Sequence, residues 1–592
     1  MTTLQSIASP CRPETILFIG AGASACLDMP PTDSQAKIIF KLCDKEITED
    51  IFKFDCFDDT SKHDMCQFLR LLDFKDSDLH VITDEQLKIS HEAFPEATED
   101  ERRLRIVELR RNYDWPALKL IAKARKDYFY IREENKPPDN YLQEIYNMID
   151  VLLKDNRGFT LTNDDGQDIH LSPERLRAAR EMMILLGNLM FGCAYRKALN
   201  DSASMDNWVP YRRFADTVAS LMEDEADNLA KTLSDSPQAS ESKGIFASRM
   251  FYLFSYAILT TNFEPIFLWL FYQAHMKCNK NHDIRLGSPG RKLQLMMDFP
   301  NILAMRDPVD KDEELNLNFS FPVSEVSAQR LNDQRHLSDR IMRLGKFFFV
   351  HGSSNFRHCP RCGRLNLALG DSWDEKSPTL FAPGPTKALS WGIIPRSDKE
   401  REAHRRGEYD AMECLFCGEL THAKDNFMYM QTQLKGSAPS FIKEITDEAL
   451  SDLPSVKHIV LLGYRLPPDD TIWSATMFAL LNRNKNRKVY CSVVCGYEGP
   501  DKWLYGDEVL EVVHKYRHTD KENAMGAGAI DNALNIFGKE YVRAYIGGIP
   551  LVFHNGDKAW IRELMYPCSG PWKGKIPEFT EHGVVRNIKK GT

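Results

Sequence analysis

The stretch that most constrains the fold is ILFIGAGASACLDMPPT, residues Ile16–Thr32. Its four apolar residues Ile16–Ile19 predict a buried parallel strand, and Gly20 and Gly22 follow directly. Glycine permits a sharp turn and lets a ligand approach where a Cβ would block it. A strand that opens through such a turn into a helix can present backbone N–H groups to a pyrophosphate. Because the third glycine of that fingerprint is missing, the motif alone also fits an ordinary strand-to-helix turn.

Three distant stretches share the pattern of an apolar strand that ends in polar residues. They are Ala257–Glu264 (AILTTNFE), Phe347–Ser353 (FFFVHGS) and Ile459–Asp470 (IVLLGYRLPPDD). In open α/β sheets, ligands bind at the carboxyl ends of the strands. We therefore expect the polar ends of these strands, Asn262 and His351 among them, to form one site with the glycine turn.

Two C-x-x-C-G pairs predict a metal site. Cys359 and Cys362 form the first pair, and Cys414 and Cys417 form the second. The following glycine permits the tight turn in which backbone N–H groups face a thiolate, and two such turns make a four-thiolate site suited to zinc. Four thiolates leave no open coordination position, so we expect a structural zinc. The alternatives are two unrelated reduced pairs or a redox pair.

Composition narrows the class of protein. A chain of 592 residues exceeds one ordinary core, so we expect two or three folding units. The formal charge of −9 gives no argument for direct nucleic-acid binding, and no apolar run approaches a membrane span. The N-terminus lacks the basic start and apolar core of a secretory signal. The 14 cysteines, four of them in the two pairs and the others scattered, suit a reducing cytoplasm, so we expect a cytoplasmic protein.

A helical block lies between the first and second predicted core strands. Apolar residues at three- and four-residue spacing predict helices over Glu99–Tyr113, Tyr141–Leu153, Pro173–Phe191 and Tyr211–Leu233. Asn163–Gln167 (NDDGQ) indicates a turn or hairpin. The arginines of Glu101–Arg111 are paired with glutamates at helical spacing, which favours a solvated helix face over an anion site.

Further elements follow towards the C-terminus. Val489–Cys495 (VYCSVVC) and Ile549–Phe553 predict strands, whereas the glycine-rich run 524–530 favours a loop over a second phosphate site. The fold class is therefore α/β: a Rossmann-like parallel sheet with a large helical insertion and a small zinc-binding module. We divide the chain into core residues 1–95, the helical insertion 96–247, core residues 248–355, the zinc-binding module 356–425, and the remaining core and C-terminal region 426–592.

The order of these motifs resembles that of the sirtuin (silent-information-regulator) superfamily. G-A-G is followed by T-x-N, H-G, the two cysteine pairs and a G-Y-R strand end. The resemblance covers scattered core segments rather than the whole length. It implies NAD as the substrate, structural zinc, and Asn262 and His351 as the catalytic couple. The cofactor pocket that it implies is lined by Gly20, Ala21, Gly22, Ser24, Thr260, Gly463, Tyr464 and Arg465.

Each residue also has a plainer interpretation. Asn262 could cap a strand end, and His351 could be a satisfied polar core residue. Arg465 stands where the family often has serine, and it could pair with a phosphate or be a surface charge. Glu264 replaces the usual aspartate of T-Q-N-x-D. The order of the motifs favours a shared functional site over these separate explanations.

Departures from the family pattern decide among three functions. The Phe-Arg pair after the glycine turn and the F-G-E segment of an acyl-lysine groove are both missing, while the cofactor-pocket residues are kept. This resembles the bacterial anti-phage branch, whose members hydrolyse NAD, and implies an NAD glycohydrolase that forms a homo-oligomer and pairs with a HerA-type ATPase. The alternatives are an NAD-dependent protein-lysine deacylase and a non-catalytic NAD or ADP-ribose sensor subunit of a defence complex.

Overall fold

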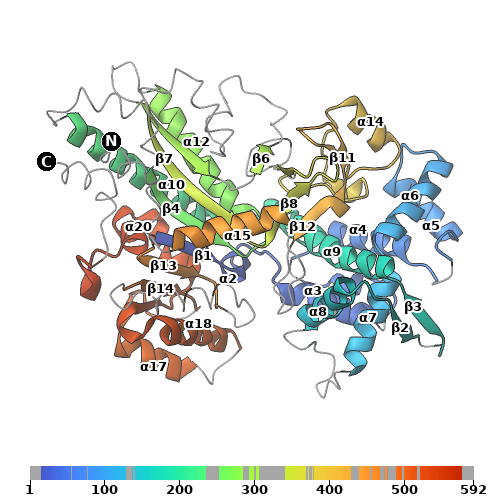
Figure 1. The fold of residues 1–592 in the computed structure, drawn as a ribbon, viewed down its shortest axis with the longest axis horizontal. Helices are drawn as coiled ribbons and strands as arrows, with labels where there is room; N and C mark the ends of the chain where they lie inside the picture. The colour runs from blue at the N-terminus through green and yellow to red at the C-terminus, as the bar shows by residue number, and fades with distance from the viewer. Residues whose placement is uncertain are drawn as a thin grey trace.

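The computed structural model is an α/β structure built on a mostly parallel sheet (Figure 1). It describes residues 15–43, 45–54, 56–75, 78–128, 137, 141–163, 165–234, 253–284, 292–298, 302–305, 340–368, 371, 377, 379–428, 439–453, 456–466, 473, 477, 488–496, 499–516 and 521–575. Within these ranges, no helix is long and apolar enough to cross a membrane.

The main sheet has eight strands. In spatial order they are β15 (Leu504–Tyr505), β16 (Val542–Tyr545), β14 (Tyr490–Val494), β13 (His458–Leu462), β1 (Thr15–Ile19), β4 (Leu253–Thr260), β7 (Arg340–Phe349) and β5 (Lys292–Asp298). Only the edge strand β15 runs antiparallel to its neighbour; the other seven strands are parallel. The central strands β1, β13 and β14 are buried along their whole length, because a parallel sheet is covered on both faces.

Helices cover both faces of this sheet. They are α10 (Ser202–Ser234), α12 (Ile266–Ile284), α15 (Ser440–Asp452), α17 (Asp507–Tyr516), α18 (Lys521–Phe537), α19 (Ile549–Val552) and α20 (Lys558–Met565). Ile258 pairs with Phe347, and Phe347 packs on Phe271 of α12 with ring centroids 5.8 Å apart. The adjacent Lys346 instead donates to Asp452 of α15 at 2.8 Å. Because neighbouring side chains of a strand point to opposite faces, α12 and α15 lie on opposite sides of the sheet.

The helical block follows β1 and lies to the right of the sheet in Figure 1. Its helices are α2 (Ala21–Ala25), α3 (Thr32–Leu42), α4 (Asp59–Leu72), α5 (Asp84–Ala93), α6 (Glu99–Asn112), α7 (Trp115–Tyr128), α8 (Tyr141–Lys154) and α9 (Pro173–Asn200). The four predicted helices are present, and α9 and α10 are longer than predicted. The predicted hairpin is formed by β2 (Phe159–Thr162) and β3 (Asp168–Leu171). Four of these helices, α2 to α5, precede the predicted start of the block at residue 96, and α7 was not predicted.

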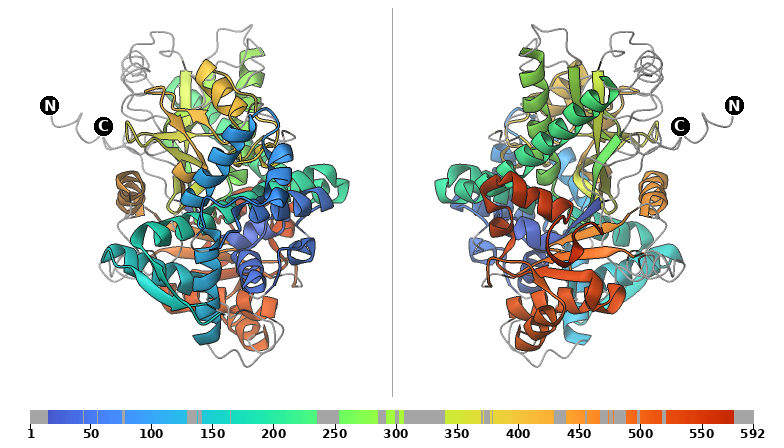
Figure 2. Two further views of the ribbon diagram at one scale, coloured as in Figure 1. Left: turned by 90° about the vertical axis from the view of Figure 1, so that its right-hand side faces the viewer. Right: turned by 90° about the vertical axis from the view of Figure 1, so that its left-hand side faces the viewer.

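A second sheet has four strands, and its longest strand begins immediately after His351. Its order is β12 (Asn426–Met428), β8 (Gly352–His358), β9 (Leu365–Leu367) and β6 (Ile302–Met305). A small hairpin of β10 (Met412–Glu413) and β11 (Leu420–Thr421) and the helix α14 (Asp398–Arg405) complete what we call the metal module, residues 352–428. Figure 2 shows the two sides of the molecule, with the metal module beside helices of the N-terminal block.

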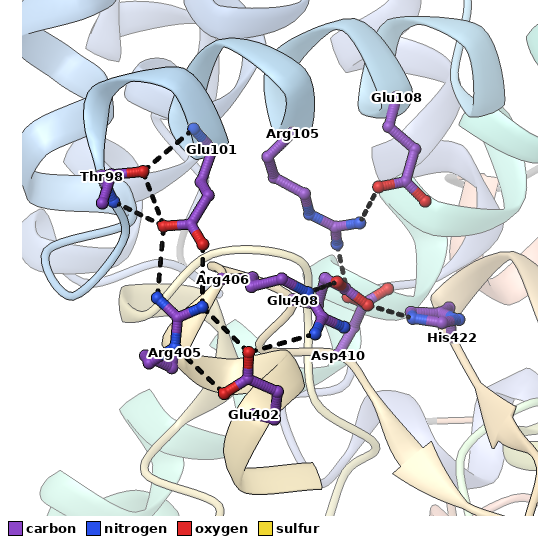
Figure 3. Close-up of polar contacts among 10 residues, drawn as sticks. All are labelled: Thr98, Glu101, Arg105, Glu108, Glu402, Arg405, Arg406, Glu408, Asp410 and His422. Carbon is purple, nitrogen blue, oxygen red and sulfur yellow. Dashed lines mark hydrogen bonds and ion pairs between the residues drawn. The ribbon is translucent and has the colours of Figure 1, made fainter. Parts of the chain in front are cut away.

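Ion pairs fasten the metal module to α6 (Figure 3). Arg105 Nη2 of α6 lies 2.6 Å from Asp410 Oδ1, and both side chains are almost fully buried. At the exposed end of the same contact, Arg405 Nη2 lies 2.8 Å from Glu101 Oε1. The prediction that the arginines of α6 lie on a solvated face is therefore wrong for part of the helix. Arg105 and Arg110 are buried, and Arg110 donates to backbone carbonyl groups. Their partners come from distant segments, which helical spacing does not reveal.

Two C-terminal predictions are also wrong. Residues Ile549–Phe553 do not form a strand: Ile549–Val552 is the short helix α19, entered from Gly548 at φ +97°. Pro550 explains the difference, because proline suits the first turn of a helix and cannot donate to a sheet ladder. The glycine-rich run 524–530 lies inside α18 rather than in a loop. There Gly526 lies against the end of β14, where its backbone oxygen accepts from the Cys495 sulfur at 3.6 Å.

Candidate functional site

The strand register brings the predicted site residues to one edge of the sheet. Ile19 of β1 pairs with Leu462 of β13 on one side and with Thr260 of β4 on the other, and Thr260 pairs with Phe349 of β7. All four strands are parallel, so the residues just beyond them lie at the shared carboxyl edge, where α/β proteins bind ligands. These residues are Ala21, Asn262, His351 and Tyr464.

The glycine turn packs tightly against the end of β13. Gly20 N donates to Leu462 O at 3.0 Å, and Gly22 N donates to Gly463 O at 3.1 Å. A Cβ on Gly20 would lie 2.6 Å from Gly463 O, and a Cβ on Gly463, at φ +61°, would lie 2.3 Å from Ala23 N. These glycines are therefore required by the packing of two strand ends. The Gly22 N–H that a pyrophosphate could have used is engaged within the protein.

Asn262 joins the end of β4 to the glycine turn. Its Nδ2 donates to Gly20 O at 3.1 Å, to Ser24 Oγ at 2.5 Å and to Glu264 Oε1 at 3.1 Å. Its backbone N–H is held by Thr260 Oγ1 at 3.0 Å. The Ser24 hydroxyl donates in turn to Glu264 Oε1. Ser24, Asn262 and Glu264 thus form one buried hydrogen-bonded cluster, which we call the Asn262 cluster.

Glu264 is the residue in this cluster that the sequence assignment left out. Its side chain is 4% exposed. Burial raises the pKa of the Glu264 carboxyl from 4.5 to about 7, and the hydrogen bonds from Ser24 and Asn262 oppose that rise only in part. Near neutral pH this carboxyl exists in both protonation states, which is the property of a group that exchanges protons in an active site. The signal in the sequence was its place two residues after Asn262 on the same strand exit.

His351 lies at the end of β7 and is 1% exposed. The Phe263 ring stands beside it, with ring centroids 6.3 Å apart and planes tilted by 33°. Phe263 O accepts hydrogen bonds from Ser354 N at 2.7 Å and from Ser353 Oγ at 3.0 Å, so the exit of β4 is tied to the start of β8. Phe263 therefore faces His351, while its two neighbours Asn262 and Glu264 face Ser24. The structure brings the two predicted catalytic residues to adjacent strand ends.

The remaining predicted cofactor-binding residues differ in their surroundings. Thr260 is buried and supports Asn262 through its hydroxyl. The Tyr464 ring is buried in the core and stacks on Phe18, with centroids 5.9 Å apart and an interplanar angle of 18°. Arg465 is exposed, and its backbone oxygen accepts a hydrogen bond from Asn532 at 3.0 Å. Of these residues, Thr260 is in direct contact with the Asn262 cluster.

The four cysteines form a compact cluster in the metal module. All four sulfurs lie within 4.8 Å of one another, with Cys359 Sγ 3.6 Å from Cys417 Sγ and Cys362 Sγ 3.7 Å from Cys414 Sγ. A zinc ion bound tetrahedrally at about 2.3 Å needs sulfur–sulfur separations of about 3.8 Å. Residues that are distant in sequence thus supply a donor set and spacing that could hold a metal ion such as zinc.

Neighbouring groups lower the pKa of Cys414, whereas burial raises the pKa values of Cys359 and Cys362. Asn366 Nδ2 donates to Cys414 Sγ at 3.4 Å. Although burial raises the pKa of Cys414, hydrogen bonds from the backbone N–H groups of Phe416 and Cys417, together with Asn366 and Cys359, bring that pKa to about 7. A lowered thiol pKa favours the thiolate form that binds metals.

Comparison with known proteins gives no independent assignment. The chain matches no protein-family model and no curated protein.

Proposed function

We propose that this protein is an NAD glycohydrolase of the sirtuin-like superfamily, which cleaves NAD to nicotinamide and ADP-ribose. The observation that carries the proposal is the convergence of Ser24, Asn262 and Glu264 with His351 at the carboxyl edge of four parallel strands. This is the edge at which open α/β sheets bind nucleotides. The ordered motifs of the sequence give the same assignment.

Cleavage of NAD requires the protein mainly to position the substrate and the nucleophile. The leaving nicotinamide is already a cationic pyridinium, and the ribose carbon gains oxocarbenium character as the bond breaks. The site must hold the ribose, exclude bulk water and deliver one nucleophile. An asparagine amide can donate and accept hydrogen bonds at once, so Asn262 would orient water or a ribose hydroxyl. A neutral histidine can accept a proton near pH 7, so His351 would act as a base or anchor the ribose.

Asn262 is 7% exposed and His351 is 1% exposed, so both side chains are shielded from bulk water, as this chemistry needs. A free NAD hydrolase would deplete its cell, so we propose that the activity is regulated. We further propose that the helical block supports a homo-oligomer, that a HerA-type ATPase is a partner, and that the metal of the cysteine cluster is structural zinc.

The test is NAD turnover by the purified full-length chain, with nicotinamide and ADP-ribose separated and quantified. Asn262→Ala and His351→Ala are expected to lose turnover. Asn535→Ala and His514→Ala, at exposed positions of α18 and α17, are matched controls that should retain it. If nicotinamide is released only when an acylated lysine peptide is present, the protein is a deacylase. If NAD binds without turnover and His351→Ala binds it equally well, the protein is a non-catalytic sensor.

A further inference from the structure

The two carboxylate oxygens of Glu264 have different surroundings. Oε1 accepts two hydrogen bonds within the Asn262 cluster, one from the Ser24 hydroxyl and one from Asn262 Nδ2. Oε2 is shielded from solvent, yet no donor or acceptor among the described residues contacts it. A buried carboxylate oxygen without a partner is costly, so proteins keep such groups mainly where they serve a purpose. Of the two Glu264 oxygens, Oε2 is therefore the one that no described residue engages and that could act on another molecule.

We propose that Glu264 is the catalytic base of the NAD hydrolysis proposed above, on which this inference rests. In this step Glu264 Oε2 removes a proton from a water molecule. The water oxygen forms a bond to C1′ of the nicotinamide ribose, and the electron pair of the breaking C–N bond neutralises the pyridinium nitrogen. The products are ADP-ribose, neutral nicotinamide and a protonated Glu264, which returns its proton to solvent. The carboxylate also stabilises the positive charge that develops on the ribose.

Position favours Glu264 over His351 for this role. Glu264 lies on the same side of the strand exit as Asn262, and its Oε1 accepts from Asn262 Nδ2 at 3.1 Å, so the Glu264 carboxyl lies beside the amide that is proposed to orient the water. The His351 ring stands against Phe263, whose side chain lies on the other side of the same strand exit. Under this proposal His351 anchors the ribose, and the Asn262 amide orients the attacking water.

The pKa of the Glu264 carboxyl suits a base that works at neutral pH. Burial raises it to about 7, and the opposing contributions come from hydrogen bonds with Ser24, Asn262 and the backbone. No charged side chain among the described residues contributes to that value. Titratable groups on the elements that pack around the cluster are Cys26 beyond α2, Tyr211 of α10, whose hydroxyl donates to Ala23 O, and His351 beyond β7.

The decisive variant is Glu264→Gln. The glutamine carbonyl oxygen can accept both hydrogen bonds that Oε1 accepts, and the amide nitrogen replaces the oxygen that has no partner. A purely structural Glu264 would tolerate this change. A catalytic base would not, and we expect kcat to fall by at least about 100-fold with little change in NAD affinity. Wild-type kcat should rise with pH to a plateau with a midpoint near 7, and the residual activity of Glu264→Gln should lack that rise.

Two further measurements exclude trivial explanations. Thermal unfolding of Glu264→Gln shows whether the variant is folded. If it is not, Glu264→Asp keeps a carboxyl one methylene further away and should retain the pH dependence at reduced kcat. In Glu264→Ala, added formate should restore part of the activity by supplying the missing carboxylate, and it should not restore activity to Asn262→Ala.

The outcomes distinguish a failure of the Glu264 proposal from a failure of the proposed NAD hydrolysis. Suppose that wild type hydrolyses NAD and that the kcat of Glu264→Gln stays within about threefold of the wild-type kcat, or keeps the same pH dependence. Either result overturns the role of Glu264 and leaves the proposed hydrolase activity intact. Absence of formate rescue in a folded, NAD-binding Glu264→Ala also argues against the base. Wild-type protein that binds NAD but releases no nicotinamide under any condition overturns both.

Discussion

Glu264 should make the stability of this protein depend on pH in an unusual direction. The residue is 4% exposed, and burial raises the pKa of its carboxyl from 4.5 to about 7. The folded state therefore binds this proton more tightly than the unfolded state, and stability falls as pH rises from 4.5 to 7, with no further loss above that range. At about 1.4 kcal/mol per pH unit, the carboxyl lowers the free energy of unfolding by about 3 kcal/mol at pH 8 relative to pH 4.

Glu264→Gln removes the titrating group while an acceptor oxygen remains for Ser24 and Asn262. We expect this variant to become more stable relative to wild type as pH rises from 5 to 8, by most of that ~3 kcal/mol. Chemical unfolding followed by tryptophan fluorescence, in matched buffers at each pH, measures the difference. Glu511→Gln, on an exposed part of α17, is the control for loss of one carboxyl. A Glu264→Gln difference that stays constant across this pH range would refute the reasoning.

Three other predictions follow from the structure. Purified protein should contain about one zinc per chain by elemental analysis, and Cys414→Ala should abolish it; full zinc content in that variant would contradict the four-thiolate site. Asp410→Ala should lower the free energy of unfolding by about 3–5 kcal/mol, because it removes the buried carboxylate and leaves the buried Arg105 with only the part-exposed Glu108 as a partner. Glu402→Ala in the exposed pairs should cost at most about 1 kcal/mol. Equal effects of the two changes in urea unfolding would contradict the buried pair. Gly463→Ala should destabilise the protein and weaken NAD binding, as measured by calorimetry. The reason is that φ of Gly463 is +61° and the new Cβ would lie 2.3 Å from the α2 backbone. A variant as stable as wild type would show that the turn tolerates a side chain.

Local sequence was sufficient for the framework of the site. Short apolar runs followed by Gly20, Asn262 or His351 predicted parallel strands that end at one edge, and the register confirms this placement. The two C-x-x-C-G pairs predicted the cysteine cluster for the same reason: each pair carries its own turn geometry within five residues. These features can be predicted from sequence because residues that are neighbours along the chain determine the strand or the turn.

Contacts between distant segments were beyond the reach of sequence. Helical spacing on α6 indicated exposed Glu–Arg pairs, yet the Arg105 charge is buried against Asp410, some three hundred residues away. The glycine-rich run 524–530, which was predicted to be a loop, lies within α18. Packing of this helix against the sheet outweighs the low helix propensity of glycine.

The sequence by itself determined which residue types stand at the strand ends and which cysteines can share a metal. Only the tertiary structure decided what those residues do to one another. It directed the Gly22 N–H to Gly463 O, buried the Tyr464 ring on Phe18, and left one oxygen of Glu264 without a partner among the described residues. The physical reason is that burial, hydrogen-bond partners and pKa depend on what surrounds a group in three dimensions, and here the surroundings come from segments hundreds of residues apart.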